Sequence, residues 1–165
     1  MILKPCSNNL YPCGFAGIGR AFSLIELVLV MTIISVLAAI AVPRYANALS
    51  RYRADAAARR AIADLDYARR YAMNASQSVE VQINSSQDSI QIVGVQSLDD
   101  PAKPWLTDLS AEPYHADIVI SSFPMGKVTF DGYGIPDTAG GFQVSSGQEA
   151  RWIMLDKDTG KATIQ

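Results

Sequence analysis

Few side chains in this sequence have the types and spacing that catalysis or metal binding requires. The chain has one histidine, His115, and no nucleophile or base is readable around it, so we expect an exposed, structural residue. Asp156, Lys157 and Asp158 have calcium-loop spacing, but a third acid and a distal glutamate are missing, which favours a plain β-turn. These residues predict no enzyme activity, no cofactor and no metal.

The number of cysteines and the overall charge exclude further classes of protein. Cys6 and Cys13 are too few for a disulfide framework or a four-thiolate zinc site. A net charge of −2 and a pI of about 5.3 argue against a nucleic-acid-binding protein that acts through whole-chain charge. With 165 residues, 49% of them hydrophobic, the chain can form one small domain with an appendage and is not intrinsically disordered.

The most unusual charged residue is Glu26, because it lies inside a long apolar run. Residues 24–42 contain no other charge, and as a helix they span about 28 Å, close to the hydrocarbon thickness of a bilayer. The run is longer than the apolar part of a cleavable secretory signal, and it leads into more helix-like sequence. We therefore predict a retained membrane helix rather than a buried core helix.

Two roles are open for Glu26 on these grounds. A carboxylate within an apolar run costs a few kcal/mol unless it is paired, which makes the residue a functional candidate. An acid near the start of a helix is also favoured by the helix dipole, which would give Glu26 a purely local role.

A polar segment precedes the apolar run. Residues 1–21 contain two basic residues, no acid and three glycines, so this segment cannot insert into a membrane by itself. Residues 18–26 read IGRAFSLIE. A small residue, Ala21, is thus followed by Phe22, and Glu26 lies four residues later.

This junction resembles the class III signal of type IV pilins and type II secretion pseudopilins. The resemblance covers residues 19–45, with the small residue before a phenylalanine, the acid, the apolar helix and Pro43. It implies that a prepilin peptidase cuts between Ala21 and Phe22 and that Phe22 is then N-methylated. Ala21 stands where the family usually has glycine, and alanine is small enough for cleavage. Processing of this kind removes both cysteines.

The same resemblance implies a role for Glu26 in assembly. In this family the glutamate attracts the N-terminal amine of a neighbouring subunit, which here is the amine of Phe22. The implied partners are other pilin-like subunits, the prepilin peptidase and N-methyltransferase, and an inner-membrane assembly platform. The implied location is the bacterial inner membrane, with one membrane pass, a periplasmic C-terminal domain and incorporation into a periplasmic or surface filament.

The distribution of basic residues predicts the opposite orientation. Two basic residues precede the apolar run, and five arginines follow it between residues 44 and 60. Counting positive charges therefore places the C-terminal domain in the cytoplasm. We follow the resemblance, because the leader must meet a peptidase on the cytoplasmic side.

Residues 44–75 predict an amphipathic continuation of the helix. They are rich in alanine and arginine and contain neither glycine nor proline. Pro43 should kink the helix rather than end it. The predicted apolar stripe consists of Tyr45, Leu49, Tyr52, Ala56, Ile62, Ala63, Leu65, Ala68 and Ala72.

Charge separates this amphipathic segment from the rest of the chain. Its seven arginines and three aspartates give a net charge of +4, whereas residues 76–165 have five basic and twelve acidic residues, a net charge of −7. We expect ion pairs such as Asp55–Arg59 and Asp66–Arg70 on the helix surface. A basic helix beside an acidic head suits lateral packing between neighbouring subunits, and nucleic-acid binding is disfavoured.

From residue 76 onward the pattern predicts an antiparallel sheet. Residues 79–83 and 89–93 alternate with period two and flank a turn-rich segment, which is typical of a hairpin. Residues 97–116 contain three prolines and predict a loop. Further strands are expected at 117–123, 127–131, 141–145, 150–156 and 161–165, with a turn at 157–160 between the last two.

Two segments of this region resemble H-type minor pseudopilins and related minor pilins. They are KVTFDGYG at 127–134 and DKDTGKATIQ at 156–165. The alternative is that both are glycine-containing hairpins with no bearing on the family.

These observations predict an α+β, pilin-like protein with a long N-terminal helix followed by an antiparallel β-sheet domain. The predicted parts are a cleaved leader (1–21), a transmembrane and assembly helix (22–43), an amphipathic continuation (44–75) and a periplasmic β-rich domain (76–165). The expected function is that of a structural minor subunit of a type II secretion pseudopilus. The alternatives are a minor pilin of a type IV pilus, for adhesion or DNA uptake, and a membrane-anchored periplasmic binding domain.

Overall fold

The computed structural model describes residues 22–97 and 100–165. The chain divides into two compact units, with the boundary between Ala39 and Ile40. One helix, α1 (Leu24–Ala75), contributes to both units. The predicted leader and Ala21 lie outside the described residues.

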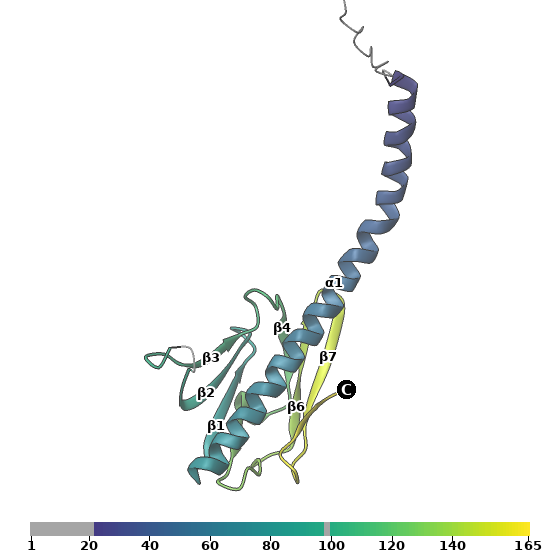
Figure 1. Ribbon diagram of the computed structural model, residues 1–165. Helices are drawn as coiled ribbons and strands as arrows, with labels where there is room; N and C mark the ends of the chain where they lie inside the picture. Colours follow the sequence, from purple (N-terminus) through teal and green to yellow (C-terminus); the bar gives the residue numbers. More distant parts are fainter. Residues whose placement is uncertain (1–21, 98–99) are drawn as a thin grey trace, which may run out of the picture. The chain divides into compact units, whose positions relative to one another are not determined.

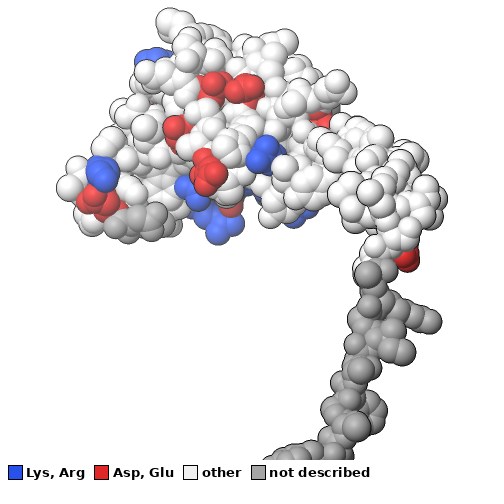
Figure 2. Space-filling view, turned by 90° about the horizontal axis from the view of Figure 1, so that it is seen from above, with Lys and Arg blue, Asp and Glu red and all other residues white. Residues whose placement is uncertain are grey.

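The first unit contributes residues 24–39 of α1. Its side chains are exposed throughout and most of them are large and apolar. Figure 2 shows that the surface next to the grey residues is uncharged apart from one acidic group. A helix satisfies its backbone hydrogen bonds internally, which is what an apolar segment in lipid requires. By length and composition, α1 is the one helix among the described residues that could cross a membrane.

Two hydroxyl groups on this apolar helix bond to the helix itself. Thr32 Oγ1 donates to the Leu29 carbonyl oxygen at 2.7 Å, and Ser35 Oγ donates to that of Met31 at 2.7 Å. Such bonds to the preceding turn are the usual arrangement for Ser and Thr in apolar helices. Neither hydroxyl is therefore presented as a nucleophile.

In the second unit, α1 packs against sheets through small side chains. Figure 1 shows this part of α1 lying over the strands. The buried helix residues are Ala54, Ala57, Ala58, Ala61, Asp64, Leu65, Ala68 and Ala72. Alanine allows the helix backbone to approach the strands closely, and most of the large apolar side chains of the core come from the sheets.

The predicted apolar stripe is therefore wrong in part. Leu65, Ala68 and Ala72 are buried, but Tyr45, Tyr52 and Ala63 are exposed, and Leu49, Ala56 and Ile62 are half-buried. The physical reason is that the true contact face follows the alanines at 54, 57, 58 and 61. A tyrosine on that face would hold the helix away from the sheets.

The strands form two four-stranded antiparallel sheets. The first has the order β3-β2-β1-β5 and the second β4-β6-β7-β8. The strands of the first are β1 (Val79–Asn84), β2 (Ser89–Gln96), β3 (Pro104–Asp108) and β5 (Lys127–Phe130). Those of the second are β4 (Asp117–Ser121), β6 (Gly140–Ser146), β7 (Glu149–Leu155) and β8 (Ala162–Ile164). A 3₁₀ turn, η1 (Pro124–Gly126), leads into β5.

The predicted hairpin is present, and one predicted loop is wrong. β1 pairs with β2 in the register Val81 to Ile92 and Ile83 to Ile90, with these apolar side chains buried. The segment 97–116, expected to be a loop, contains β3. Pro104 is the first residue of β3, and β3 is an edge strand of its sheet. Proline has no backbone N–H to donate, and at the start of an edge strand no such donor is needed. Trp105 and Thr107 then alternate into the core.

One core joins the helix to both sheets. Phe130 from the first sheet and Phe142 from the second are both fully buried, together with Leu65 of α1. The predicted α+β class, with one long N-terminal helix followed by antiparallel sheets, is confirmed.

Candidate functional site

The start of α1 presents the residues for which the sequence predicts processing and assembly. Phe22 precedes the helix and is 80% exposed. The Ser23 carbonyl oxygen accepts hydrogen bonds from the backbone N–H groups of Glu26 (3.0 Å) and Leu27 (3.1 Å), which begins the helix. Ala21 lies outside the described residues, so only the Phe22 side of the predicted cleavage junction has a described position.

Glu26 lies in the first turn of α1 and is exposed. None of the ion pairs among the described residues includes it. The helix dipole favours a carboxylate at this position. Glu26 therefore lies about one helical turn from Phe22, and its carboxylate forms no ion pair with another described residue.

The apolar surface that follows Glu26 needs a cover that the described chain does not supply. Residues 24–42 expose leucine, isoleucine, valine and methionine side chains on every face of the helix. A patch of this size is unfavourable in water and is typical of a membrane span or a protein interface. Pro43 lies inside α1, and the helix continues past it. A kink at Pro43 stays a prediction.

A buried polar cluster that sequence reasoning missed fastens α1 to β3. Asp64 is 1% exposed, and its Oδ1 accepts a hydrogen bond from Trp105 Nε1 at 3.3 Å. Arg60 Nε lies 3.3 Å from the same oxygen, and Arg60 Nη2 donates to Thr107 Oγ1 at 3.2 Å. Trp105 also stacks on Tyr67, with ring centroids 4.3 Å apart. The sequence signal that could have found this cluster is Asp64, an acid at helical spacing from the buried positions 61, 65 and 68.

The charge on Asp64 is only partly compensated. Its Oδ2 atom is buried without a hydrogen-bond partner. Burial raises the pKa of the Asp64 carboxyl, and Thr107, Arg60 and Trp105 oppose this rise only in part. The cluster fixes the orientation of helix and sheet, and its place inside the core leaves no access for a substrate.

Ion pairs tie the helix to the second sheet. Arg151 Nε lies 2.6 Å from Asp55 Oδ1, and Arg51 Nε lies 2.8 Å from Glu149 Oε1. The predicted Asp55–Arg59 pair is therefore wrong, because Arg151 on β7 takes the aspartate.

The second ion pair expected on the helix surface is present. Arg70 Nη2 lies 2.7 Å from Asp66 Oδ2, so the predicted Asp66–Arg70 pair is confirmed.

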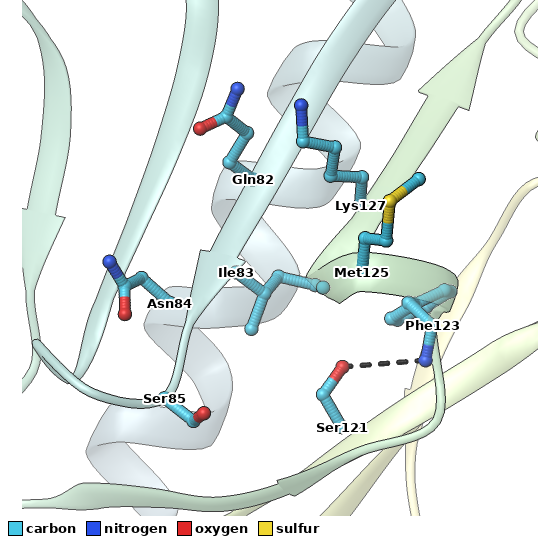
Figure 3. A pocket seen from close by; sticks show the side chains of 9 residues that line it. Gln82, Ile83, Asn84, Ser85, Ser121, Phe123, Met125 and Lys127 are labelled. Atoms are coloured by element: carbon cyan, nitrogen blue, oxygen red, sulfur yellow. Dashed lines mark hydrogen bonds between the residues drawn. The ribbon is translucent and has the colours of Figure 1, made fainter.

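A cavity of about 530 Å³ lies between the end of β1 and the turn before β5. Figure 3 shows Gln82, Asn84 and Lys127 around it, with Ser121 and Phe123 joined by a hydrogen bond. Its polar groups are largely engaged within the chain, since Asn84 Oδ1 accepts bonds from the next turn and Lys127 Nζ lies 3.0 Å from Glu80 Oε1. This arrangement offers no nucleophile with an activating base.

The other candidates have structural surroundings. Asp156 Oδ1 accepts hydrogen bonds from the backbone N–H groups of Asp158 (3.0 Å) and Thr159 (2.8 Å), so it caps the turn, and these bonds lower the pKa of its carboxyl. His115 is exposed, as expected, and its Nε2 lies 3.8 Å from Glu112 Oε1. Within residues 22–97 and 100–165, no group of three His, Cys, Asp or Glu side chains is arranged for a metal ion.

The two segments that resemble minor pseudopilins lie against each other. Gly160 has a positive φ of 64°, and a Cβ at this position would collide with the Gly134 carbonyl oxygen. The turn at 156–160 and the turn at 131–134 thus pack together through their backbones. Glycine is needed at 160 for both reasons.

Comparison with solved structures finds the same fold in a pilin. Two crystal forms of the type IV minor pilin FimU from Pseudomonas aeruginosa (strain PAO1) match with TM-scores of 0.54 and 0.51 and 18% sequence identity. The matches cover 70% and 67% of this chain and 90% and 91% of FimU. This likeness shows that the fold is pilin-like. A comparison with curated protein sequences finds no match.

Comparison with protein families gives two matches that together span most of the chain. Residues 20–42 match the prokaryotic N-terminal methylation motif. Residues 57–159, more than half of the chain, match the type II transport protein GspH. The suspected resemblance to pilin-like proteins and H-type pseudopilins is thereby confirmed, and the chain belongs to the GspH family.

Proposed function

We propose that this chain is a structural minor subunit of a type II secretion pseudopilus. The observation that carries the proposal is the pairing of two features in one chain. Residues 20–42 match the methylation motif and form a helix whose apolar surface is exposed, and residues 57–159 of the same chain match GspH. A pilin-like subunit of this family assembles with other pilin-like subunits, and the exposed helix is the natural surface for that contact.

The proposed maturation begins at the inner membrane. A prepilin peptidase cuts between Ala21 and Phe22, and an N-methyltransferase modifies the new amine of Phe22. The leader faces the cytoplasm and residues 44–165 face the periplasm. The membrane helix is then transferred from lipid to a helix bundle with the help of an inner-membrane assembly platform. None of these maturation steps requires a catalytic residue from this chain.

Glu26 is proposed to set the register of assembly. Its carboxylate has no partner in the described chain, and cleavage creates an ammonium group at Phe22 of each subunit. Either charge alone in an apolar bundle is costly, by about 3–5 kcal/mol when one partner of a buried pair is removed. A pair formed between neighbouring subunits satisfies both charges at once.

The test is replacement of Glu26 in the full precursor. We expect Glu26→Ala and Glu26→Gln to insert into the membrane and lose the leader as wild type does, because the cut precedes any subunit contact. Both should lose co-purification with the other pilin-like subunits. Glu112→Ala, which removes an exposed acid in the head, is the matched control and should co-purify normally.

Normal co-purification of processed Glu26→Gln would overturn the assembly role, because a helix-dipole contribution of about 0.3–1 kcal/mol is all that then remains for the residue.

A type IV pilus is the second candidate. The specific observation in its favour is the fold likeness to the minor pilin FimU. Identification of the subunits that co-purify with the chain separates the two candidates, because secretion and pilus systems have different major subunits.

A further inference from the structure

A basic and an aromatic residue, Arg44 and Tyr45, follow directly after the apolar run of α1. The helix is continuous from Leu24 to Ala75, so positions along it can be counted from Val42, the last residue of the run. Arg44 then lies about 3 Å and Tyr45 about 4.5 Å beyond Val42 along the helix. The head-group layer on each side of a bilayer is about 5–8 Å thick. Both residues therefore lie in this layer when residues 24–42 span the hydrocarbon core.

Arg44 has no acidic partner among the described residues. Its side chain is exposed, and it takes part in none of the ion pairs of residues 22–97 and 100–165. Arg51, seven residues later and on the same face of α1, lies 2.8 Å from Glu149. The head thus supplies a carboxylate two helical turns further along, but none to Arg44. A guanidinium group suits a phosphate group, which accepts two parallel hydrogen bonds from it.

Tyr45 has the side chain that the same depth favours. It is 72% exposed. Tyrosine is enriched where hydrocarbon meets water, because its ring is apolar and its hydroxyl group is polar. Tyr52 is as exposed as Tyr45, but it lies about 15 Å beyond Val42, outside the head-group layer. Arg44 and Tyr45 are therefore the basic and aromatic pair at this depth.

A second copy of α1 offers no anion at this depth. Two copies that span one bilayer in the same direction place Arg44 beside Arg44, which is unfavourable. The nearest acids of α1 are Glu26 and Asp55, about 27 Å and 16 Å away along the helix. Asp55 is also engaged by Arg151, whose Nε lies 2.6 Å from its Oδ1. Lipid phosphates, in contrast, surround a membrane helix at the level of Arg44.

Other unpaired arginines of α1 lie too far from the bilayer to share this role. Arg53 and Arg59 also form no ion pair among the described residues. They lie about 16 Å and 25 Å beyond Val42, whereas charges in solution are screened over about 8 Å at physiological salt. Arg59 is exposed like Arg44, so it serves as a control that differs mainly in its depth.

We propose that Arg44 and Tyr45 form a binding site for the head group of an anionic phospholipid. The guanidinium group of Arg44 pairs with the phosphate, and Tyr45 anchors the helix at the same level. The inference goes beyond the proposed function, because it needs a membrane-spanning α1 and not a filament. Transfer of the helix from lipid to a helix bundle breaks this contact, so the site holds the unassembled chain in the bilayer.

The experiment is photocrosslinking of the full chain in vesicles of equimolar phosphatidylglycerol and phosphatidylcholine with identical acyl chains. A photoreactive residue replaces Ala46, which is exposed and lies about 6 Å beyond Val42. Mass spectrometry measures the ratio of the two lipid adducts, which does not depend on how much of the chain has inserted. We expect about fivefold more phosphatidylglycerol adduct, the preference that one basic residue near an anionic surface gives.

The preference should depend on the charge at position 44. Arg44→Gln should bring the ratio close to one, and Arg44→Glu should bring it below one. Arg44→Lys should keep most of the preference, because lysine also pairs with phosphate. Tyr45→Ser should lower the ratio by less than Arg44→Gln, since tyrosine carries no charge. Arg59→Gln, the matched control, removes the same charge and should leave the ratio at the wild-type level.

Three results overturn the proposal. The first is an equal yield of the two lipid adducts with Arg44 present. The second is a loss of preference in Arg59→Gln as large as that in Arg44→Gln, which would mean that net charge acts in place of a site. The third is an adduct with a second copy of this chain in place of lipid. A chain that carbonate extracts from the vesicles also overturns it, because α1 then does not span the bilayer.

Comparison with Glu26→Gln separates this inference from the proposed function. If Glu26→Gln abolishes co-purification with pilin-like subunits and Arg44 has no effect on the lipid ratio, the lipid site is wrong and the filament role stands. If Arg44 sets the lipid ratio but wild type co-purifies with no pilin-like subunit, the lipid site stands and the filament role is wrong.

Discussion

The two halves of α1 are both rich in apolar residues, but they are built for different surroundings. The first half, residues 24–42, exposes large apolar side chains on all faces. The second half buries one face, made mainly of alanines between Ala54 and Ala72, against two sheets of its own chain. Side-chain size tells the two apart: large residues must be covered by something outside the chain, whereas small ones let the chain's own sheets approach.

Charge reinforces the same difference. Glu26 is the one charged residue in the first half. The second half is net positive and sends Arg51 and Asp55 to carboxylate and arginine partners in the second sheet. The first half is thus suited to exchange one apolar environment for another, and the second half to remain fixed to the head.

The largest expected effect comes from placing a charge on the buried face of the second half. Ala61 is fully buried in the shared core. Ala61→Arg forces an unpaired charge and extra volume into this core, at a cost of about 3–5 kcal/mol, which is a large part of the total stability of a small domain. The head should become sensitive to proteolysis. Ala63→Arg, two residues away on the exposed side, should change stability by less than about 0.5 kcal/mol.

Equal resistance of the Ala61 and Ala63 variants to proteolysis would show that the helix face assigned to the core is wrong.

The next effect concerns the first half. Leu29→Arg with Val36→Arg places two charges in the apolar run, at about 2.5–3.5 kcal/mol each on an insertion scale. We expect the protein to leave the membrane fraction while the head keeps its protease resistance. Fractionation after carbonate extraction measures this directly. If the variant loses the protease resistance of the head as well as membrane anchoring, the two halves of α1 do not act independently, which contradicts this account.

The smallest effect is the pH dependence that Asp64 adds to the second half. Burial raises the pKa of its carboxyl above the ordinary value of 3.8, so the folded state keeps this proton to higher pH than the unfolded state. The contribution of Asp64 to stability therefore falls as pH rises above 3.8 and through the raised pKa. Asp64→Asn removes this titration.

Unfolding of wild type and Asp64→Asn across pH 4 to 8 checks this sign. As pH rises above 3.8, the stability of wild type should fall relative to that of Asp64→Asn. A growing advantage for wild type would mean that Arg60 and Trp105 overcompensate the burial of the carboxylate.

The contrast between the halves also explains which features the sequence predicted. Periodicity and apolar length predicted a helix through Pro43, and α1 runs from Leu24 to Ala75. The alternation at 79–83 and 89–93 predicted β1 and β2. Each of these patterns lies within a single helix or strand, so it can be recognised without knowing which other elements pack against it.

Features that depend on contacts between distant elements were missed. The three prolines of residues 97–116 predict a loop, although this segment contains β3, in which Trp105 and Thr107 alternate into the core once β2 lies beside them. Asp55 was assigned to Arg59 four residues away, because nothing in the helix sequence reveals that Arg151 lies closer. The N-terminal site was predicted by a motif, since its residues are contiguous in the chain.

The central claim is the proposal that the mature chain begins with the amine of Phe22, two residues before the start of α1. The most direct test is intact mass spectrometry of the protein extracted from membranes of cells with an active prepilin peptidase. We predict a mass equal to residues 22–165 with one added methyl group, and an N-terminal fragment that places this methyl on Phe22. An N-terminus that still begins at Met1 would contradict the claim.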